Sequence, residues 1–166
     1  IAGQATIGRE ILEQLPSVKH VVLPMGGGGL LAGVTVGLKS IDPGIRVTGV
    51  SAERSAVLAR SVEAGKLVSL PEQETLATAL SGNLGPENHH TLRLVSELVD
   101  DYVEVSEEEI ARAMRFAFRR HRLVVEGGGS VALAAILSGR LVPDGKTALV
   151  VSGGNIDAAR FATVLT

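Results

Sequence analysis

Four consecutive glycines, at positions 26–29, follow the apolar segment 21–24 and precede a helical pattern of apolar residues that begins at Leu30. A run of glycines removes every Cβ from a turn, so several backbone N–H groups can approach one ligand closely. At the start of a helix these N–H groups lack partners within the helix, and the helix dipole favours an anion. The sequence therefore predicts a phosphate-binding loop. The alternative is a strand-to-helix turn without a ligand, but such a turn requires one or two glycines rather than four.

The composition indicates one folded domain with sites lined by backbone. The chain has 166 residues, of which 20 are glycine, against a usual share of about 7%. With 16 Lys and Arg against 18 Asp and Glu, the net charge of −2 argues against nucleic acid or an anionic membrane as the main partner. The absence of cysteine excludes disulfide and thiolate chemistry. No apolar run approaches the length of a membrane span, and we expect a cytoplasmic protein.

Apolar periodicity and turn residues predict helices alternating with strands. The expected helices cover about 5–15, 29–40, 55–64, 89–98, 107–121 and 131–137, with a final helix after 155. The expected strands cover about 20–24, 46–52, 102–105 and 148–151. Ser106 and Glu109 form a capping box, and 66–88 is expected to be a functional loop rather than a linker. This order predicts an α/β fold with an open, mostly parallel sheet and helices on both faces.

Two further segments carry candidate site residues. Ser152 and Gly153 follow the last expected strand, and ligands of open parallel sheets bind beyond the carboxyl ends of the strands. The Ser152 hydroxyl is therefore expected to contact a ligand, with an N-cap of the final helix as the alternative. It is a poor candidate nucleophile, because no G-x-S-x-G elbow surrounds it. Glu126 precedes the glycines 127–129. It is expected to orient a substrate or a loop, with a carboxylate at a helix N-terminus as the alternative.

Together these motifs resemble a known family. The segments that carry the resemblance are Ile-Ala-Gly-Gln at 1–4, the glycine loop at 24–33, Val-Ser-Glu-Glu-Glu-Ile at 105–110, Glu-Gly at 126–127 and Ser-Gly-Gly-Asn at 152–155. In this order they are similar to the C-terminal half of a fold-type II pyridoxal-phosphate enzyme of the threonine dehydratase and serine racemase group. Residues 84–90 and 115–127 also resemble the hydroxyectoine-utilisation dehydratase branch. The resemblance implies that residues 1–166 are a single cofactor-binding domain fragment without the N-terminal half of the parent enzyme.

The resemblance also implies roles for individual residues. The backbone N–H groups that would bind the cofactor phosphate belong to Gly26, Gly27, Gly28, Gly29 and Leu30. Ser152, with Gly153 beside it, would face the pyridine nitrogen. A hydroxyl does not force that nitrogen to stay protonated, so the ring is a milder electron sink, which suits β-elimination. The implied activity is that of an ammonia-lyase, or dehydratase, converting L-threonine, L-serine or a similar hydroxy-amino acid into a 2-oxo acid and ammonia. An amino-acid racemase of the same family is the alternative, and a homodimer is implied for the full enzyme.

Some family features are missing from this sequence. Relatives carry the lysine that forms the Schiff base in a segment that would precede residue 1, and none of the four lysines here lies in such a motif. We therefore expect no catalytic residue in this chain, and no activity from it alone.

Residues 75–79 read Thr-Leu-Ala-Thr-Ala where relatives often have Thr-Ile-Ala-Asp-Gly. Glu53 resembles one ligand of the racemase cation site, but Ala59 stands where a second carboxylate is expected, so no metal is predicted. The adjacent His89 and His90 could suggest a metal site, but no further ligands stand at metal-binding spacing, so they are expected to be surface residues.

Two interpretations from other classes compete with this one. Residues 27–32 fit the pattern G-x-G-x-x-A, and Glu53 follows at the distance of a ribose ligand, as in a dinucleotide-binding Rossmann domain. That interpretation leaves Gly26, Glu126 and Ser152 without a role. The other competing class is a cofactor-free binding or regulatory module.

Overall fold

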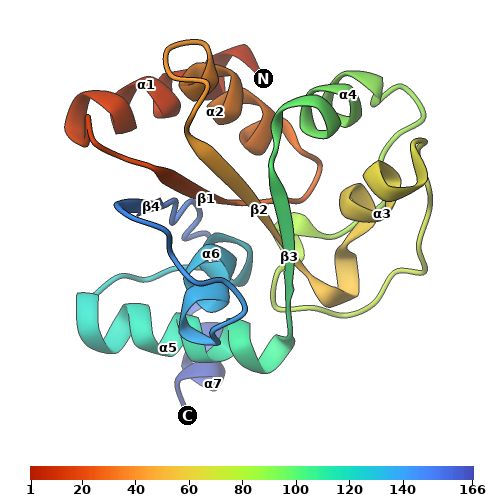
Figure 1. The fold of residues 1–166 in the computed structure, drawn as a ribbon. Helices are drawn as coiled ribbons and strands as arrows, with labels where there is room; N and C mark the ends of the chain where they lie inside the picture. Colours follow the sequence, from red (N-terminus) through yellow and green to blue (C-terminus); the bar gives the residue numbers. More distant parts are fainter.

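The structure, a computed structural model, describes residues 1–166. Four parallel strands form one sheet in the order β3-β2-β1-β4. The strands are β1 (His20–Pro24), β2 (Arg46–Ala52), β3 (Asp101–Val105) and β4 (Thr147–Leu149). This α/β architecture with a parallel sheet confirms the fold predicted from the sequence (Figure 1).

Seven α-helices cover the two faces of the sheet. One face carries α1 (Ala5–Gln14), α2 (Gly29–Lys39), α3 (Val57–Ala64) and α4 (His89–Leu98). The other face carries α5 (Glu107–His121), α6 (Gly127–Leu137) and α7 (Ala158–Leu165). None of the seven helices combines the length and the hydropathy of a membrane-spanning segment.

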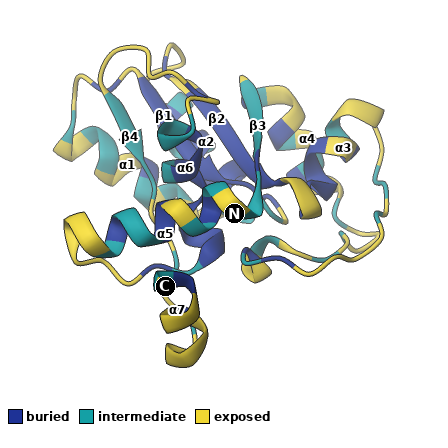
Figure 2. Cartoon of the chain, turned by 90° about the horizontal axis from the view of Figure 1, so that it is seen from below, coloured by how far each residue is buried: buried dark blue, intermediate teal, exposed yellow.

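Each face of the sheet has its own apolar core, because side chains alternate along a strand. In β1, Val21 and Leu23 belong to the core under α2, whereas Val22 belongs to the core under α6. Every residue of β1 is buried, as expected for a parallel strand covered on both sides. Figure 2 shows the consequence, since β1 and most of β2 are buried, whereas exposed residues lie on α7, on the loops and on the outer sides of other helices.

Most element boundaries agree with the prediction within one or two residues, including the capping box between Ser106 and Glu109. The start of α6 is the largest correction, because the helix begins at Gly127 rather than at 131. The last strand also differs, because it ends at Leu149 rather than at Val151. The N–H of Val150 still donates to the carbonyl of Val22 at 3.0 Å. The next donor from β1 on this side would be Pro24, which has no N–H, so the ladder cannot continue.

Candidate functional site

The glycine run forms the turn between the carboxyl end of β1 and the first residue of α2, Gly29. Gly28 is the N-cap residue of this helix and has a φ of 85° and a ψ of −5°. This left-handed conformation is strained for residues that carry a Cβ, so the turn requires glycine at this position. No side chain caps α2, so its first N–H groups are free for a ligand.

The four glycines differ in why a side chain is absent. A Cβ at Gly26 would lie 2.9 Å from the Cα of Leu80, and one at Gly28 would lie 2.6 Å from a neighbouring leucine methyl. The fold itself therefore excludes side chains at these two positions. A Cβ at Gly27 would be 3.9 Å from its nearest neighbour, and one at Gly29 would have no neighbour within 4 Å. No protein contact requires glycine at Gly27 and Gly29, so the open space in front of them can receive a ligand that approaches the backbone.

A cavity of about 260 Å³ lies at this end of the sheet. It is lined by Pro24, Gly26, Gly27, Gly28, Gly29, Leu30, Ala79, Leu80, Glu126, Gly128 and Ser152. The structure thus brings together the glycine loop, Glu126 and Ser152, which lie up to 126 positions apart in the sequence (26 to 152). A second, more apolar cavity adjoins it and shares Gly29, Leu30 and Ser152.

Ser152 is exposed on the wall shared by the two cavities. The N-cap alternative for this residue is wrong, because α7 begins at Ala158 and is capped by Asp157. The Asp157 carboxylate accepts hydrogen bonds from two backbone N–H groups of α7, at 2.9 and 3.0 Å. Ser152 therefore has no role in starting the helix, and it lines the cavity.

Glu126 occupies the N-cap position of α6, but its side chain makes no capping hydrogen bond. Its backbone N–H donates to the carbonyl of Gly153 at 3.0 Å. Its carboxylate lies directly over Gly153, where any Cβ would overlap it. Gly153 itself is not among the residues that line the cavity. It instead leaves room for the Glu126 side chain, whose carboxylate stays beside the cavity.

The glycines at 127–129 are buried in the first turn of α6 and mainly serve packing. A Cβ at Gly127 would overlap the carbonyl of Leu76, and one at Gly129 would lie 2.6 Å from the backbone of Gly153. Gly128 alone of the three lines the cavity. The backbone-lined sites expected from the glycine excess therefore do not include most of this cluster.

The loop before α4 lies in the segment expected to be functional, but the sequence did not predict its individual contacts. Its segment 75–80 is held by Glu107, which accepts the Thr75 hydroxyl at 2.6 Å and the N–H of Leu76 at 2.7 Å. Leu80, at its end, packs on the glycine loop. Further along, the Asn88 side-chain amide donates to the carbonyl of Gly27 at 3.3 Å. Glu107 belongs to the motif at 105–110, but that motif did not indicate that its carboxylate would hold the segment 75–80.

None of the four lysines lines either cavity next to Ser152. Lys39 pairs with Asp100 at 2.8 Å, and Lys146 donates to Ser17 at 2.9 Å. Lys19 borders a different cavity, and Lys66 is exposed.

Glu53 lies away from the cavity and pairs with Arg140 at 3.0 Å. Arg140 also contacts Glu109 at 2.8 Å. Partial burial acts to raise the pKa of Glu109, but hydrogen bonds from Arg140 and from the N–H of Ser106 outweigh it and hold the pKa below its usual value. No three His, Asp or Glu side chains converge as a metal site requires. Glu53 is thus part of an ion-pair network that ties the turn after β2 to α5.

The family model described as pyridoxal-phosphate dependent enzyme matches residues 1–153. The chain belongs to the pyridoxal-phosphate-dependent enzymes. The catabolic L-threonine dehydratase of Escherichia coli K12 is 44% identical over 171 residues, covering 99% of this chain and 50% of that protein. The L-threonine ammonia-lyase of Thermotoga maritima is 43% identical over 157 residues, covering 95% of this chain and 39% of that protein.

Solved structures agree with this family. Maize serine racemase superposes with a TM-score of 0.88 at 34% identity, covering 97% of this chain and 50% of that one. The chain spans about half the length of such relatives. The residues present fit pyridoxal phosphate, because the glycine loop leaves open space where a phosphate could meet the free N–H groups of α2.

Proposed function

We propose that this pyridoxal-phosphate-dependent enzyme is an ammonia-lyase that converts L-threonine, L-serine or a similar hydroxy-amino acid into a 2-oxo acid and ammonia. The observation that carries the proposal is the single cavity that joins the glycine loop, Glu126 and Ser152. The relatives named threonine dehydratase and threonine ammonia-lyase support the choice of reaction.

In this proposal the N–H groups of Gly26, Gly27, Gly28, Gly29 and Leu30 hold the cofactor phosphate. Free N–H groups at the start of α2 and the positive end of its dipole favour a bound anion there. The glycine at position 28 turns the chain, whereas those at 27 and 29 leave room for the phosphate. When bound, pyridoxal phosphate supplies an electron sink for charge that develops on the substrate.

Ser152 is proposed to contact the pyridine nitrogen, with Gly153 keeping the adjoining backbone in place. A serine hydroxyl can donate or accept a hydrogen bond, so it holds the nitrogen without imposing a protonated state. Glu126, next to this position, is proposed to orient the substrate or the loop at 152–154. Its carboxylate has the freedom to do so, because it is not engaged as a helix cap.

The lysine that forms the Schiff base is proposed to come from a segment outside these residues. The lack of any lysine on the cavity wall supports this assignment. Residues 1–166 would then be the larger part of the cofactor domain, and the N-terminal half of the parent enzyme would complete the site. The homodimer that the resemblance implies and the cytoplasmic location expected from the sequence both stay predictions.

The test uses the full-length protein loaded with pyridoxal phosphate. We expect L-threonine or L-serine to give stoichiometric 2-oxo acid and ammonia, measured by a coupled dehydrogenase assay. Ser152→Ala should lose most of this activity, whereas the control Ser96→Ala, on the exposed side of α4, should keep it. Loaded enzyme that releases ammonia from neither amino acid would refute the lyase assignment.

A racemase is the second candidate, because the superposition with maize serine racemase is close. The same incubation distinguishes the two, since a racemase converts L-serine into D-serine. Chiral chromatography that finds D-serine in excess of the 2-oxo acid would favour the racemase.

A further inference from the structure

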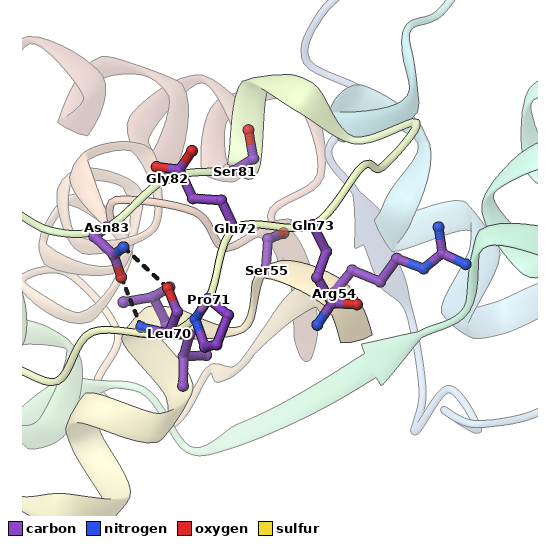
Figure 3. A pocket seen from close by; sticks show the side chains of 10 residues that line it. Arg54, Ser55, Leu70, Pro71, Glu72, Gln73, Ser81, Gly82 and Asn83 are labelled. Carbon is purple, nitrogen blue, oxygen red and sulfur yellow. Dashed lines mark hydrogen bonds between the residues drawn. The ribbon is translucent and has the colours of Figure 1, made fainter.

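Residues 74–81 lie in the long loop between α3 and α4, and two of them, Ala79 and Leu80, line the proposed cofactor cavity. The two arms of this loop are joined to each other, because the Asn83 side-chain amide donates to the carbonyl of Leu70 at 3.0 Å and its oxygen accepts the N–H of Leu70 at 2.8 Å (Figure 3). No backbone hydrogen bond joins residues 74–81 to the rest of the chain. Side chains therefore have to hold this segment against the body of the protein.

Charged side chains from three different elements bind the backbone of this segment. Arg54, in the turn after β2, donates to the carbonyl of Glu74 at 2.8 Å. Arg160, in α7, donates to the carbonyl of Thr75 at 3.0 Å. Both arginines are exposed, so water competes for these two contacts. The third side chain, Glu107, is partly buried.

Glu107, the first residue of α5, makes the shortest of these contacts. One of its carboxylate oxygens accepts the Thr75 hydroxyl at 2.6 Å, and the other accepts the N–H of Leu76 at 2.7 Å. The Thr75 oxygen in turn accepts the N–H of Ala77 at 3.0 Å. No arginine or lysine is paired with Glu107. One carboxylate thus fixes three consecutive residues of the segment.

The two acids that follow Glu107 have other surroundings. Glu108 is exposed and makes no hydrogen bond or ion pair, and Glu109 completes the capping box with Ser106. Any acid in the first turn of a helix stabilises it through the helix dipole. Only Glu107 among the three forms hydrogen bonds with residues 74–81. A comparison of Glu107 with Glu108 therefore separates the contact with this segment from the effect of charge on α5.

The part of the segment that Glu107 fixes leads directly to the cavity wall. A single 3₁₀ turn, Thr78–Leu80, follows Ala77, and the N–H of Leu80 donates to the carbonyl of Ala77 at 2.8 Å. A Cβ at Gly26 would lie 2.9 Å from the Cα of Leu80, so the backbone of this turn lies directly on the glycine loop. A shift at Ala77 would therefore move the cavity wall away from the glycine loop.

We propose that Glu107 is a positioning residue for the cofactor, because it keeps Ala79 and Leu80 against the glycine loop. Glu107 itself does not line the cavity. The inference rests on the proposed placement of the cofactor phosphate in this cavity. The apparent affinity for a ligand falls with the fraction of molecules whose site is in the binding-competent arrangement. Loss of two hydrogen bonds to a charged group lowers that fraction.

Titration of the full-length apoenzyme with pyridoxal phosphate, followed by absorbance, tests this role. We expect Glu107→Ala to bind the cofactor at least about tenfold more weakly, as for the loss of one or more hydrogen bonds to a charged group. Glu108→Ala should bind it as the unsubstituted protein does. Val18→Ala is a second control, because Val18 is buried two residues before β1, at the other end of that strand. Its truncation should lower stability but not cofactor affinity.

Hydrogen exchange of the apoenzyme gives a measurement that does not depend on the cofactor. The amides of residues 75–80 should exchange faster in Glu107→Ala than in Glu108→Ala, whereas those of β1 should exchange equally in both. Thr75→Val removes the hydroxyl that Glu107 accepts and should also weaken cofactor binding. Thr75→Ser keeps the hydroxyl and should bind the cofactor more tightly than Thr75→Val. This pair decides the question if Glu107→Ala does not fold.

Three results would overturn the role of Glu107. They are equal cofactor affinity in folded Glu107→Ala and Glu108→Ala, equal exchange of residues 75–80 in these two proteins, and an equal loss of affinity in Val18→Ala. If Gly29→Ala weakens cofactor binding and Glu107→Ala does not, only the positioning role is wrong. If neither substitution weakens it, the placement of the cofactor in this cavity is wrong as well.

Discussion

Alanine substitutions at two adjacent glycines separate the needs of the fold from those of the cofactor. At Gly28 a Cβ would be forced into a φ of 85° and placed 2.6 Å from the Cδ2 of Leu58. The left-handed conformation costs about 1–2 kcal/mol and the crowding about 1–3 kcal/mol. We therefore expect Gly28→Ala to lower the free energy of unfolding by about 2–5 kcal/mol.

At Gly29 the same substitution has the opposite effect on the fold. The position is the first residue of α2, and a Cβ there has no neighbour within 4 Å. Alanine has a higher helix propensity than glycine by up to about 1 kcal/mol, so stability should be unchanged or higher. The new methyl group would occupy the open space in which we propose that the phosphate lies.

The cofactor should therefore bind more weakly to Gly29→Ala although the fold is intact. Hydrogen bonds to a charged group contribute about 1.5–3 kcal/mol, so displacement of one such contact corresponds to a loss of about 10- to 150-fold in affinity. Urea denaturation gives the stability, and titration of the full-length apoenzyme with pyridoxal phosphate, followed by absorbance, gives the affinity. Unchanged affinity in a stable Gly29→Ala protein would refute the proposed phosphate site.

Three more predictions follow from single contacts. Gly127→Ala should destabilise the chain by about 1–3 kcal/mol in urea denaturation despite its better helix propensity, because the new Cβ would overlap the carbonyl of Leu76. Asp157→Ala removes a helix cap and should lower the free energy of unfolding by about 0.5–2 kcal/mol. Ser152→Ala, by contrast, should leave the urea midpoint unchanged and lower cofactor affinity. Burial lowers the pKa of His20, so the unfolded chain takes up the proton first on acidification. The stability due to neutral His20 is present above about pH 6.5 and is lost as the pH falls through the lower folded-state pKa. The urea midpoint should therefore decrease when the pH is lowered from about 7.5 to about 5. In His20→Gln this decrease should be less steep.

The order and kind of the elements could be predicted because local signals agree with one another. The glycines after β1, the capping box at Ser106 and the strand pattern at 46–52 each mark an element through chemistry within a few residues. The end of β4 could not be predicted in this way. It depends on Pro24, which is distant in the sequence and becomes the neighbour of β4 only when the sheet forms.

The candidate site was only partly predictable. Ser152 and Glu126 were found because a polar residue beside glycines at the end of a strand or the start of a helix has few packing reasons to be there. Leu80 and Asn88 carry no such signal. Their place beside the glycine loop follows from how the segment between α3 and α4 folds back over the sheet.

The sequence by itself determined the α/β class, the parallel sheet and the family, because these rest on periodicity and on short motifs in a fixed order. The tertiary structure decided which glycine serves which purpose. Gly26, Gly28, Gly127 and Gly129 lack side chains because another part of the chain, or the turn itself, leaves no room for one, whereas Gly29 faces open space. Identical residues can be told apart only by what lies within a few ångströms of them, and those neighbours are set by packing between segments far apart in the chain.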